Sequence, residues 1–292
     1  MSASLVCIVP PAAEPVSLDE IRDFVEIPDG DTSRDVKLTS FLIAAREDCE
    51  RWTRTKLVTQ TWLLRMDGLP SISIQYDRNG YAQIHLPFPP FQSVEFFKYV
   101  DTAGQVQPLL RDTSYGNGPN PPNFGYQLQP GGGLIPARIL PTWARPWPPE
   151  RMVPASNMIQ FRCGYGGPLT VSIAAGSNAL IVAGGFTFNP DDAQVMPGDT
   201  GTKITITGAG AGAADLVTSI ASVDLSGNAT LADTASTAVT NGAAWLGAPI
   251  PEALRLSIMF HAQFFFEQGA VIDQAIPRIV ETLRGPCRNL VS

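Results

Sequence analysis

Residues 33–54 read SRDVKLTSFLIAAREDCERWTR, and this stretch decides the class of fold. Its apolar residues recur at spacings of four and three, at Leu38, Leu42, Ala45, Cys49 and Trp52. Such a pattern lines up one narrow apolar stripe, so the sequence predicts a long amphipathic helix here. The other side of the helix is charged, which fits either a solvated face with i,i+4 ion pairs or a contact between subunits. The charged residues are Arg46, Glu47, Glu50, Arg51 and Arg54.

A shorter helix is expected just before this stretch. Ser17 is followed three residues later by Glu20, and this spacing fits a capping box at a helix N-terminus. The sequence Pro-Asp-Gly at 28–30 ends that helix, because proline and glycine both interrupt helical backbone. The first part of the chain, up to about residue 56, is therefore predicted to be helical.

Helical signals return at the C-terminal end. Pro251 and the glutamate after it open a helix that continues to about Phe266. The phenylalanines of this helix widen its apolar surface beyond one stripe, which indicates a central position in the domain or an oligomer interface. A last short helix is expected from Pro277 to the Gly285-Pro286 pair.

The part between these helical regions, about residues 57–166, reads as strands. The turn sequences at 77–80 and 101–104 contain glycine and are typical of hairpins. Residues 117–149 are dominated by Pro, Gly and Asn, so we expect a long excursion with little regular structure, held down by Trp143 and Trp147. The expected strands are 59–66, 72–76, 82–86, 94–100 and 158–162.

Residues 168–248 differ in composition from the rest of the chain. They hold one basic residue, Lys203, with six aspartates and no glutamate, and they are rich in Ala, Gly, Thr, Ser and Val. Short alternating runs separated by turn residues are typical of a small all-β module. A shift of this kind inside a chain suggests an inserted domain. Its strands are expected near 180–182, 203–207, 217–223 and 229–231.

The sequence offers little chemistry for catalysis. No metalloprotease, nucleophile-elbow or phosphate-loop motif occurs, and the four cysteines lie too far apart for a zinc or redox motif. His85 lies in a strand pattern and His261 on an apolar helix face, where a satisfied core or interface histidine is the usual outcome. The pair Asp191-Asp192 lacks the further ligands of a calcium loop. We therefore expect neither an active site nor a metal or cofactor site.

Charge and hydropathy exclude two further classes. The net charge is −7, whereas a protein that grips DNA by its phosphates is normally basic. No run of eighteen apolar residues occurs and no basic residue precedes Arg22, so neither a membrane span nor a secretory leader is predicted. Charged residues make up only 16% of the chain, which suggests that much of its surface is covered by something else.

Several blocks of the chain resemble the head-tail connector (adaptor) proteins of long-tailed phages and gene transfer agents. The resemblance covers roughly 1–167 and 249–292, and the module at 168–248 departs from it by separating two matching blocks. The matching blocks are Glu14–Glu20, the helix end Glu50-Arg51-Trp52-Thr53, 57–62, 86–94 with Tyr99-Val100-Asp101, Arg162-Cys163-Gly164-Tyr165-Gly166, and Pro251-Glu252-Ala253-Leu254.

The resemblance implies a fold class and a domain division. The expected class is α+β, with a helical adaptor core of long amphipathic helices and β-hairpins. This core is discontinuous, formed by 1–167 and 249–292, and the two parts are expected to pack as one helix-and-sheet body. An inserted all-β, sandwich-like domain would occupy 168–248.

The resemblance also implies a function. Such an adaptor is a structural virion protein rather than an enzyme, and it forms a closed ring, commonly a homododecamer, in the neck between the capsid portal and the stopper or tail-completion protein. Genome DNA passes through the lumen without sequence-specific binding, for which an acidic protein is suitable. The residues expected to dock on the portal are Leu283, Arg284, Arg288, Asn289 and Leu290, and those expected at the subunit interface are Arg46, Glu50, Arg54, Phe260 and Phe264.

Two alternatives remain open from the sequence. One is another tail or baseplate structural protein that carries a β module. The other is a hydrolase of cell-wall glycan with the acidic module as carbohydrate binder, although no facing pair of carboxylates is evident.

Overall fold

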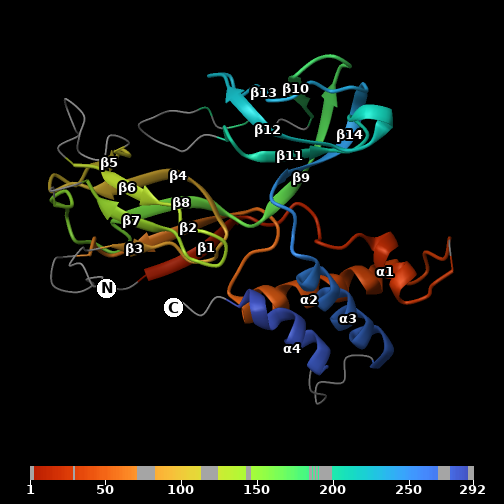
Figure 1. The fold of residues 1–292 in the computed structure, drawn as a ribbon. Coiled ribbons are helices and arrows are strands. Elements are labelled where there is room, and N and C mark those ends of the chain that lie inside the picture. Colours follow the sequence, from red (N-terminus) through yellow and green to blue (C-terminus); the bar gives the residue numbers. More distant parts are fainter. Residues whose placement is uncertain are drawn as a thin grey trace.

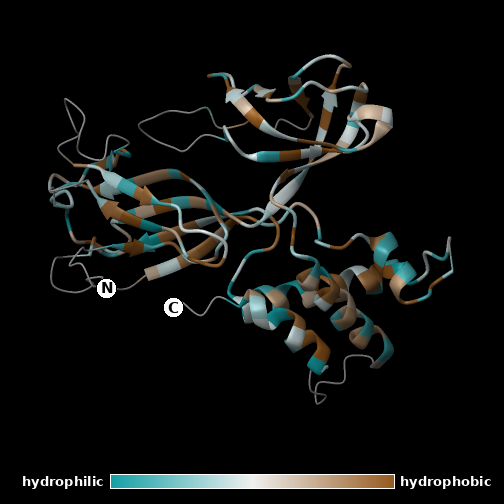
Figure 2. Cartoon of the chain, in the orientation of Figure 1, coloured by the Kyte–Doolittle hydropathy of each residue, from teal (hydrophilic) through white to brown (hydrophobic). Residues whose placement is uncertain are grey.

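The computed structural model places the chain in three units that meet at one junction: packed β-sheets, a β-barrel and a helical unit (Figure 1). Hydrophobic residues are distributed over all three (Figure 2), and each unit has a buried apolar cluster of its own. The structure describes residues 3–28, 30–70, 83–112, 124–142, 146–183, 186, 188, 190, 199–268 and 277–288.

The first unit is built from two antiparallel sheets. The larger has the strand order β1 (Ala3–Val9), β2 (Gln60–Met66), β8 (Asn157–Cys163), β4 (Phe91–Val100) and β5 (Val106–Pro108). The smaller has the order β3 (Ile84–His85), β7 (Arg138–Pro141) and β6 (Tyr126–Gln129). Apolar side chains of both sheets form one core.

Most sequence predictions for this unit are confirmed. The prediction that the chain is helical up to about residue 56 is wrong for Ala3–Val9, which form β1 because they pair with β2, a strand more than fifty residues away. The predicted strands 59–66, 94–100 and 158–162 correspond to β2, β4 and β8, and β3 lies within 82–86. The turn at 101–104 joins β4 to β5, with Gly104 at φ 85°, a value that favours glycine. The strand expected at 72–76, the turn at 77–80 and Trp143 lie outside the described residues.

The excursion at 117–149 is more regular than expected, because it contains β6 and β7. In β6 the side chains of Tyr126 and Leu128 point into the core and the two glutamines that alternate with them are more exposed, which is the alternation of a half-buried strand. Trp147 packs against the core, with its ring centroid 6.1 Å from that of Phe97, so its anchoring role is confirmed.

The helical unit comprises α1 (Leu18–Phe24), α2 (Asp35–Thr53), α3 (Glu252–Gln268), α4 (Arg278–Arg284) and a 3₁₀ turn, η2 (Gly285–Cys287). The capping box at Ser17 and Glu20 is confirmed by both of its hydrogen bonds. The predicted stripe of α2 is buried from Leu38 to Cys49 and α2 packs against α3, where Cys49 Sγ lies 3.7 Å from Ser257 Oγ. The last residue of the predicted stripe, Trp52, is only partly buried. The N-terminal and C-terminal helices thus share one core, but the sheets have a separate one, which corrects the expected single helix-and-sheet body.

The third unit is a closed barrel with the strand order β10-β13-β12-β11-β14-β9. The prediction of a sandwich-like module is therefore wrong in its topology, although the all-β class is right. The barrel closes because β9 and β14, which the sequence did not reveal as strands, pair along most of their length. Its strands are β9 (Gly166–Ile173), β10 (Ala179–Val182), β11 (Lys203–Ile206), β12 (Leu216–Val223), β13 (Ala229–Leu231) and β14 (Val239–Gly247), with a short 3₁₀ turn, η1 (Ala211–Ala213).

Candidate functional site

A cluster of polar groups joins three helices: Asp48 on α2, His261 on α3 and Arg284 on α4. The Arg284 guanidinium donates to Asp48 (Nη1–Oδ2 2.7 Å) and to His261 (Nη2–Nδ1 3.0 Å). Arg284 is only 1% exposed, so its charge depends on these two partners. We infer that this cluster holds α4 against α2 and α3.

This position corrects the prediction that Arg284 docks on the portal. Val280 and Arg284 are one helical turn apart, and both are buried on the inner face of α4. The isolated sequence could not show that the acceptors for Arg284 are supplied by two other helices, more than twenty and more than two hundred residues away.

His261 is a satisfied core histidine, as predicted. Because arginine only donates hydrogen bonds, His261 Nδ1 must be the acceptor, and the ring proton lies on Nε2. Burial lowers the pKa of His261, and the neighbouring Arg284 lowers it further, to about 4, against the opposing effect of Asp48. The unfolded chain therefore binds this proton first as the pH falls, and folding stability is lost between about pH 6.5 and 4.

A second buried charged cluster lies where the end of α2 meets β2. The Glu50 carboxylate accepts hydrogen bonds from Lys56 Nζ at 2.9 Å and from Gln60 Nε2 at 3.0 Å. Arg46 lies 3.4 Å from Glu50 and donates from Nε to Glu14 at 2.8 Å. These contacts join α2 both to the strand that follows it and to the N-terminal segment.

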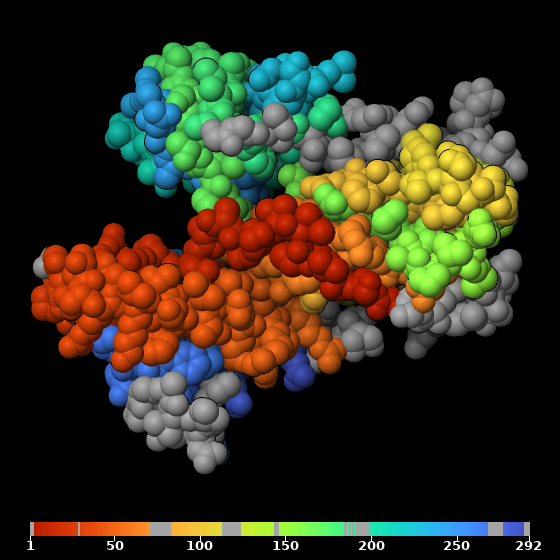
Figure 3. Space-filling model, turned by 180° about the vertical axis from the view of Figure 1, so that it is seen from behind, coloured from red at the N-terminus to blue at the C-terminus, as the bar shows by residue number. Residues whose placement is uncertain are grey.

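The burial of this cluster corrects part of the predicted interface. Arg46 is 5% exposed and Glu50 is 3% exposed, so neither lies on a solvated face of α2. The N-terminal segment, which runs over the outside of the molecule beside the helices, brings Glu14 to Arg46 (Figure 3). Arg54, by contrast, is exposed at the end of α2.

The other residues predicted at the subunit interface or at the portal contact are partly buried or exposed. Phe260 is partly buried, in edge-to-face contact with Phe24 at 5.1 Å between ring centroids, and Phe264 is also partly buried. Leu283 is partly buried, and Arg288 is exposed with its guanidinium 4.9 Å from the centre of the Trp52 ring. Asn289 and Leu290 lie outside the described residues.

The junction between the units is built around two glycines of the Arg-Cys-Gly-Tyr-Gly block. Gly164 has φ 126°, and a Cβ atom there would lie 2.6 Å from the carbonyl oxygen of Val58. Its amide donates to Pro90 O at 2.8 Å, and the carbonyl of Gly166 accepts from the Thr59 amide at 2.7 Å. The close backbone approach explains why glycine is required at this point.

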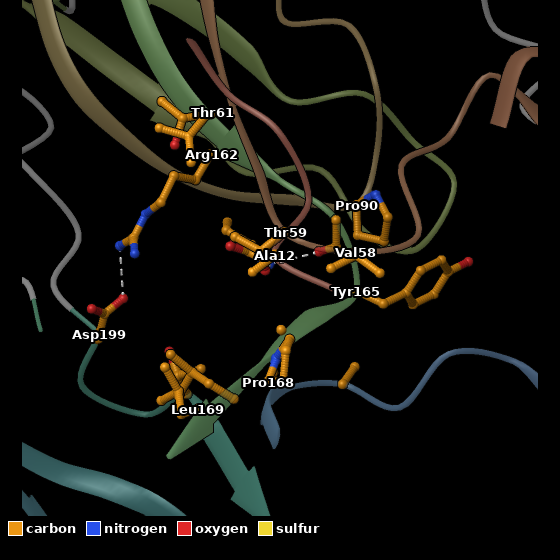
Figure 4. A pocket seen from close by; sticks show the side chains of 18 of the residues that line it. Ala12, Val58, Thr59, Thr61, Pro90, Arg162, Tyr165, Pro168, Leu169 and Asp199 are labelled. Carbon is orange, nitrogen blue, oxygen red and sulfur yellow. Dashed lines mark hydrogen bonds and ion pairs between the residues drawn. The ribbon is translucent and has the colours of Figure 1, made fainter. Parts of the chain in front are cut away.

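A cavity of about 770 Å³ opens beside this junction, between the larger sheet and the barrel (Figure 4). Arg162 reaches across it from β8 to Asp199, with Nη2 3.0 Å from Oδ1. Ser93 Oγ accepts from Arg162 Nε at 3.0 Å, and Glu95 lies 3.7 Å from the same nitrogen. Arg162 thus binds groups on both sides of the cavity, which fits a connection between the sheet and the barrel.

Within the described ranges, no three His, Cys, Asp or Glu side chains gather as metal ligands. No helix in that part of the chain is long and apolar enough to cross a membrane. Sequence reasoning missed Asp48, Glu14, Arg162 and Asp199, because their partners are distant in the chain and no spacing marks such pairs.

The fold over the whole length of the chain is similar to that of chains from gene transfer agent (GTA) particles. A chain in the neck of an empty GTA particle, computed with C6 symmetry, matches with a TM-score of 0.51 and 16% identity, covering 100% of this chain and 97% of that one. A chain in the virion of a native GTA particle matches with a TM-score of 0.51 and 16% identity, covering 99% and 96%. No known family and no curated protein sequence matches the chain. At 16% identity, this likeness shows that the folds are similar and no more than that.

Proposed function

We propose that this chain is a structural protein of the neck of a phage-like particle, the head-tail connector (adaptor) that forms a ring between the portal and the stopper or tail-completion protein. The observation that carries the proposal is the fold likeness to a GTA neck chain over essentially the full length of both chains. The order of the matching sequence blocks, on either side of the barrel, supports the same assignment.

The chemistry of the chain agrees with a conduit for DNA. With a net charge of −7, the subunit attracts the phosphate backbone weakly, and DNA can move through the lumen without being held. The buried charged clusters bind partners within the same chain and fix the helices in place. A subunit of this kind acts by holding its shape against its neighbours, without catalysis.

The test is to image particles made with and without this chain. Particles that contain it are expected to show a ring of density against the portal, with the subunit number fixed by symmetry-resolved reconstruction, and particles that lack it are expected to have heads without attached tails. A sixfold ring away from the portal would favour another tail or baseplate protein. Particles that assemble completely without the chain would refute the proposal.

We further propose that the barrel is an inserted, peripheral module, which acts as a spacer or as a contact to the capsid or a tail part. Its strands all lie within 166–247, it has a core of its own, and its first and last residues, Gly166 and Gly247, are paired opposite each other. An element whose ends are adjacent can be removed with little strain on the rest.

Replacing residues 167–247 by a short Gly-Ser linker tests this. The truncated chain is expected to keep its helical and sheet cores, measured by amide hydrogen exchange, and to enter rings with full-length chains. A truncated chain that neither folds nor joins rings would show that the barrel is part of the structural core.

The proposed portal contact is the segment after Arg284. Arg288 is exposed there, Asn289 and Leu290 belong to the same segment, and Leu283 lies at its base. Deletion of 288–292 is expected to abolish binding to purified portal while leaving the urea unfolding midpoint unchanged. Unchanged portal binding would place the contact elsewhere.

A further inference from the structure

The two ends of the helical unit carry opposite charges. At one end, Asp19, Asp23 and Glu26 are exposed on α1 and just after it, with the Asp19 side chain 87% exposed. At the other end, Arg51 on the last turn of α2 and Arg54 just after it are exposed. The Arg51 side chain is 81% exposed, although one of its nitrogens is paired with Asp48. We call these surfaces the acidic end and the basic end.

The length of α2 separates the two ends. Arg22 of α1 forms an ion pair with Asp35, the first residue of α2, so α1 lies at the N-terminus of that helix. The nineteen residues of α2 then span about 28 Å to Thr53. Figure 1 shows α1 at one extreme of the helical unit and the chain leaving α2 toward β2 at the other.

Basic residues near the acidic end are engaged within the chain. Arg22 forms ion pairs with Asp19 and Asp35. Arg34 and Lys37, at the start of α2, face aromatic rings: the Arg34 guanidinium lies 5.5 Å from the ring centre of Phe266, and Lys37 Nζ lies 5.7 Å from it. Arg34 and Lys37 keep their charge and are exposed, but they belong to the start of α2, whereas the exposed charged residues of α1 itself are all acidic.

The acidic face of α1 is also separate from its apolar face. Ile21 is fully buried, and Leu18 and Phe24 pack against the helical core, so α1 is held firmly by its inner side. Asp19 and Asp23 are one turn apart and point the other way, to the outside. A rigid, charged face of this kind is suited to contact another protein.

We propose that the acidic end of one subunit contacts the basic end of the next copy of this chain in the ring. A closed ring of identical subunits needs a head-to-tail contact between two different surfaces of the same chain. The two ends meet this requirement, because they are opposite in charge and lie at opposite extremes of one rigid helical unit. Complementary charge would set the direction and register of the subunits as the ring forms. This inference rests on the ring proposed above.

Charge reversal in full-length chains tests the contact. One variant carries Asp23→Lys and Glu26→Lys, which makes both ends basic, and a second carries Arg51→Glu and Arg54→Glu, which makes both ends acidic. Each alone is expected to enter neck rings at least about tenfold less than the wild-type chain, because like charges then meet at every contact. Incorporation is measured by quantitative mass spectrometry of purified particles.

Rescue distinguishes a contact from a folding defect. When the two variants are co-expressed, opposite charges again meet at every contact of an alternating ring, and incorporation is expected to recover. A chain that carries all four substitutions should recover as well. The matched control, Arg278→Glu with Glu281→Lys, reverses two exposed charges on α4 and should assemble like the wild type.

The outcomes separate the two proposals. If the wild-type chain is absent from the neck, the proposed function is refuted and this contact with it. If the wild-type chain is present, but the single-end variants enter equally well, or neither co-expression nor the fourfold variant restores assembly, the contact is refuted and the neck function stands.

Discussion

Replacing Asp48 by alanine should destabilise the helical unit severely. Arg284 is buried, and Asp48 is its carboxylate partner at 2.7 Å. After the substitution, the Arg284 guanidinium keeps the neutral His261 ring as an acceptor but no negative charge. Breaking a buried ion pair by removing one partner typically costs about 3–5 kcal/mol. We expect Asp48→Ala to lower the free energy of unfolding of the helices by about that amount.

Two further variants test whether the loss of stability in Asp48→Ala comes from leaving a buried charge without its partner. Asp19→Ala removes a carboxylate with a similar ion pair, to Arg22 at 2.6 Å, but its side chain is 87% exposed, so the expected cost is below about 1 kcal/mol. The double variant Asp48→Leu with Arg284→Met replaces the buried pair by apolar groups. It should recover most of the loss, because no buried charge is left without a partner.

The assay must resolve the helical unit from the other units, since a chain with three cores need not unfold in one step. Amide hydrogen exchange of α2, α3 and α4, followed by mass spectrometry, gives the local opening free energy. Urea unfolding followed by circular dichroism near 222 nm gives an independent value. If Asp48→Ala costs no more than Asp19→Ala, Arg284 does not depend on Asp48 and the account of the cluster is wrong.

Three more predictions concern single sites. The helical unit should lose about 2 kcal/mol of stability between pH 6.5 and 4 as His261 protonates in the unfolded chain, and His261→Gln should flatten this dependence in urea titrations. Gly164→Ala should lower the thermal midpoint by several degrees, because its Cβ would meet backbone at 2.6 Å, whereas Gly176→Ala, also at positive φ but in open space, should cost only about 1 kcal/mol. Glu50→Ala should cost about 3 kcal/mol in urea unfolding because it leaves Lys56 without its carboxylate, and a loss below about 1 kcal/mol would refute that role.

Local patterns predicted the elements with strong periodicity or strong terminal signals. The stripe from Leu38 to Cys49 specified α2, and the Ser17–Glu20 spacing specified the start of α1, because both depend on residues within one or two turns. The hairpin at 101–104 followed from turn chemistry in the same way. The strands β6, β7, β9 and β14 were missed, since prolines, glycines and small residues conceal their alternation. The strands β1 and β5 at the two edges of the larger sheet were also missed, because each is defined by its pairing with a single neighbouring strand.

The candidate site was harder to predict from the sequence than the fold. The charges of Arg46, Glu50 and Arg284 were expected on surfaces, because isolated charged residues are usually exposed. Each is buried, and each has partners on segments that local spacing does not connect to it, such as Glu14 for Arg46 and Asp48 for Arg284. Whether a charged side chain is exposed depends on which segments pack over it. Local residue spacing carries no information about segments that are distant in the chain.

The sequence by itself therefore determined the helices, most of the strands of the larger sheet, the all-β character of residues 168–248 and the lack of recognisable catalytic motifs. These properties follow from side-chain periodicity and backbone preference over short distances. Only the tertiary structure decided that the barrel closes through β9 and β14, that the helices and sheets have separate cores, and that the two ends of the helical unit carry opposite charge. Those features arise from contacts between residues far apart in the chain, whose free energies depend on packing and burial in three dimensions.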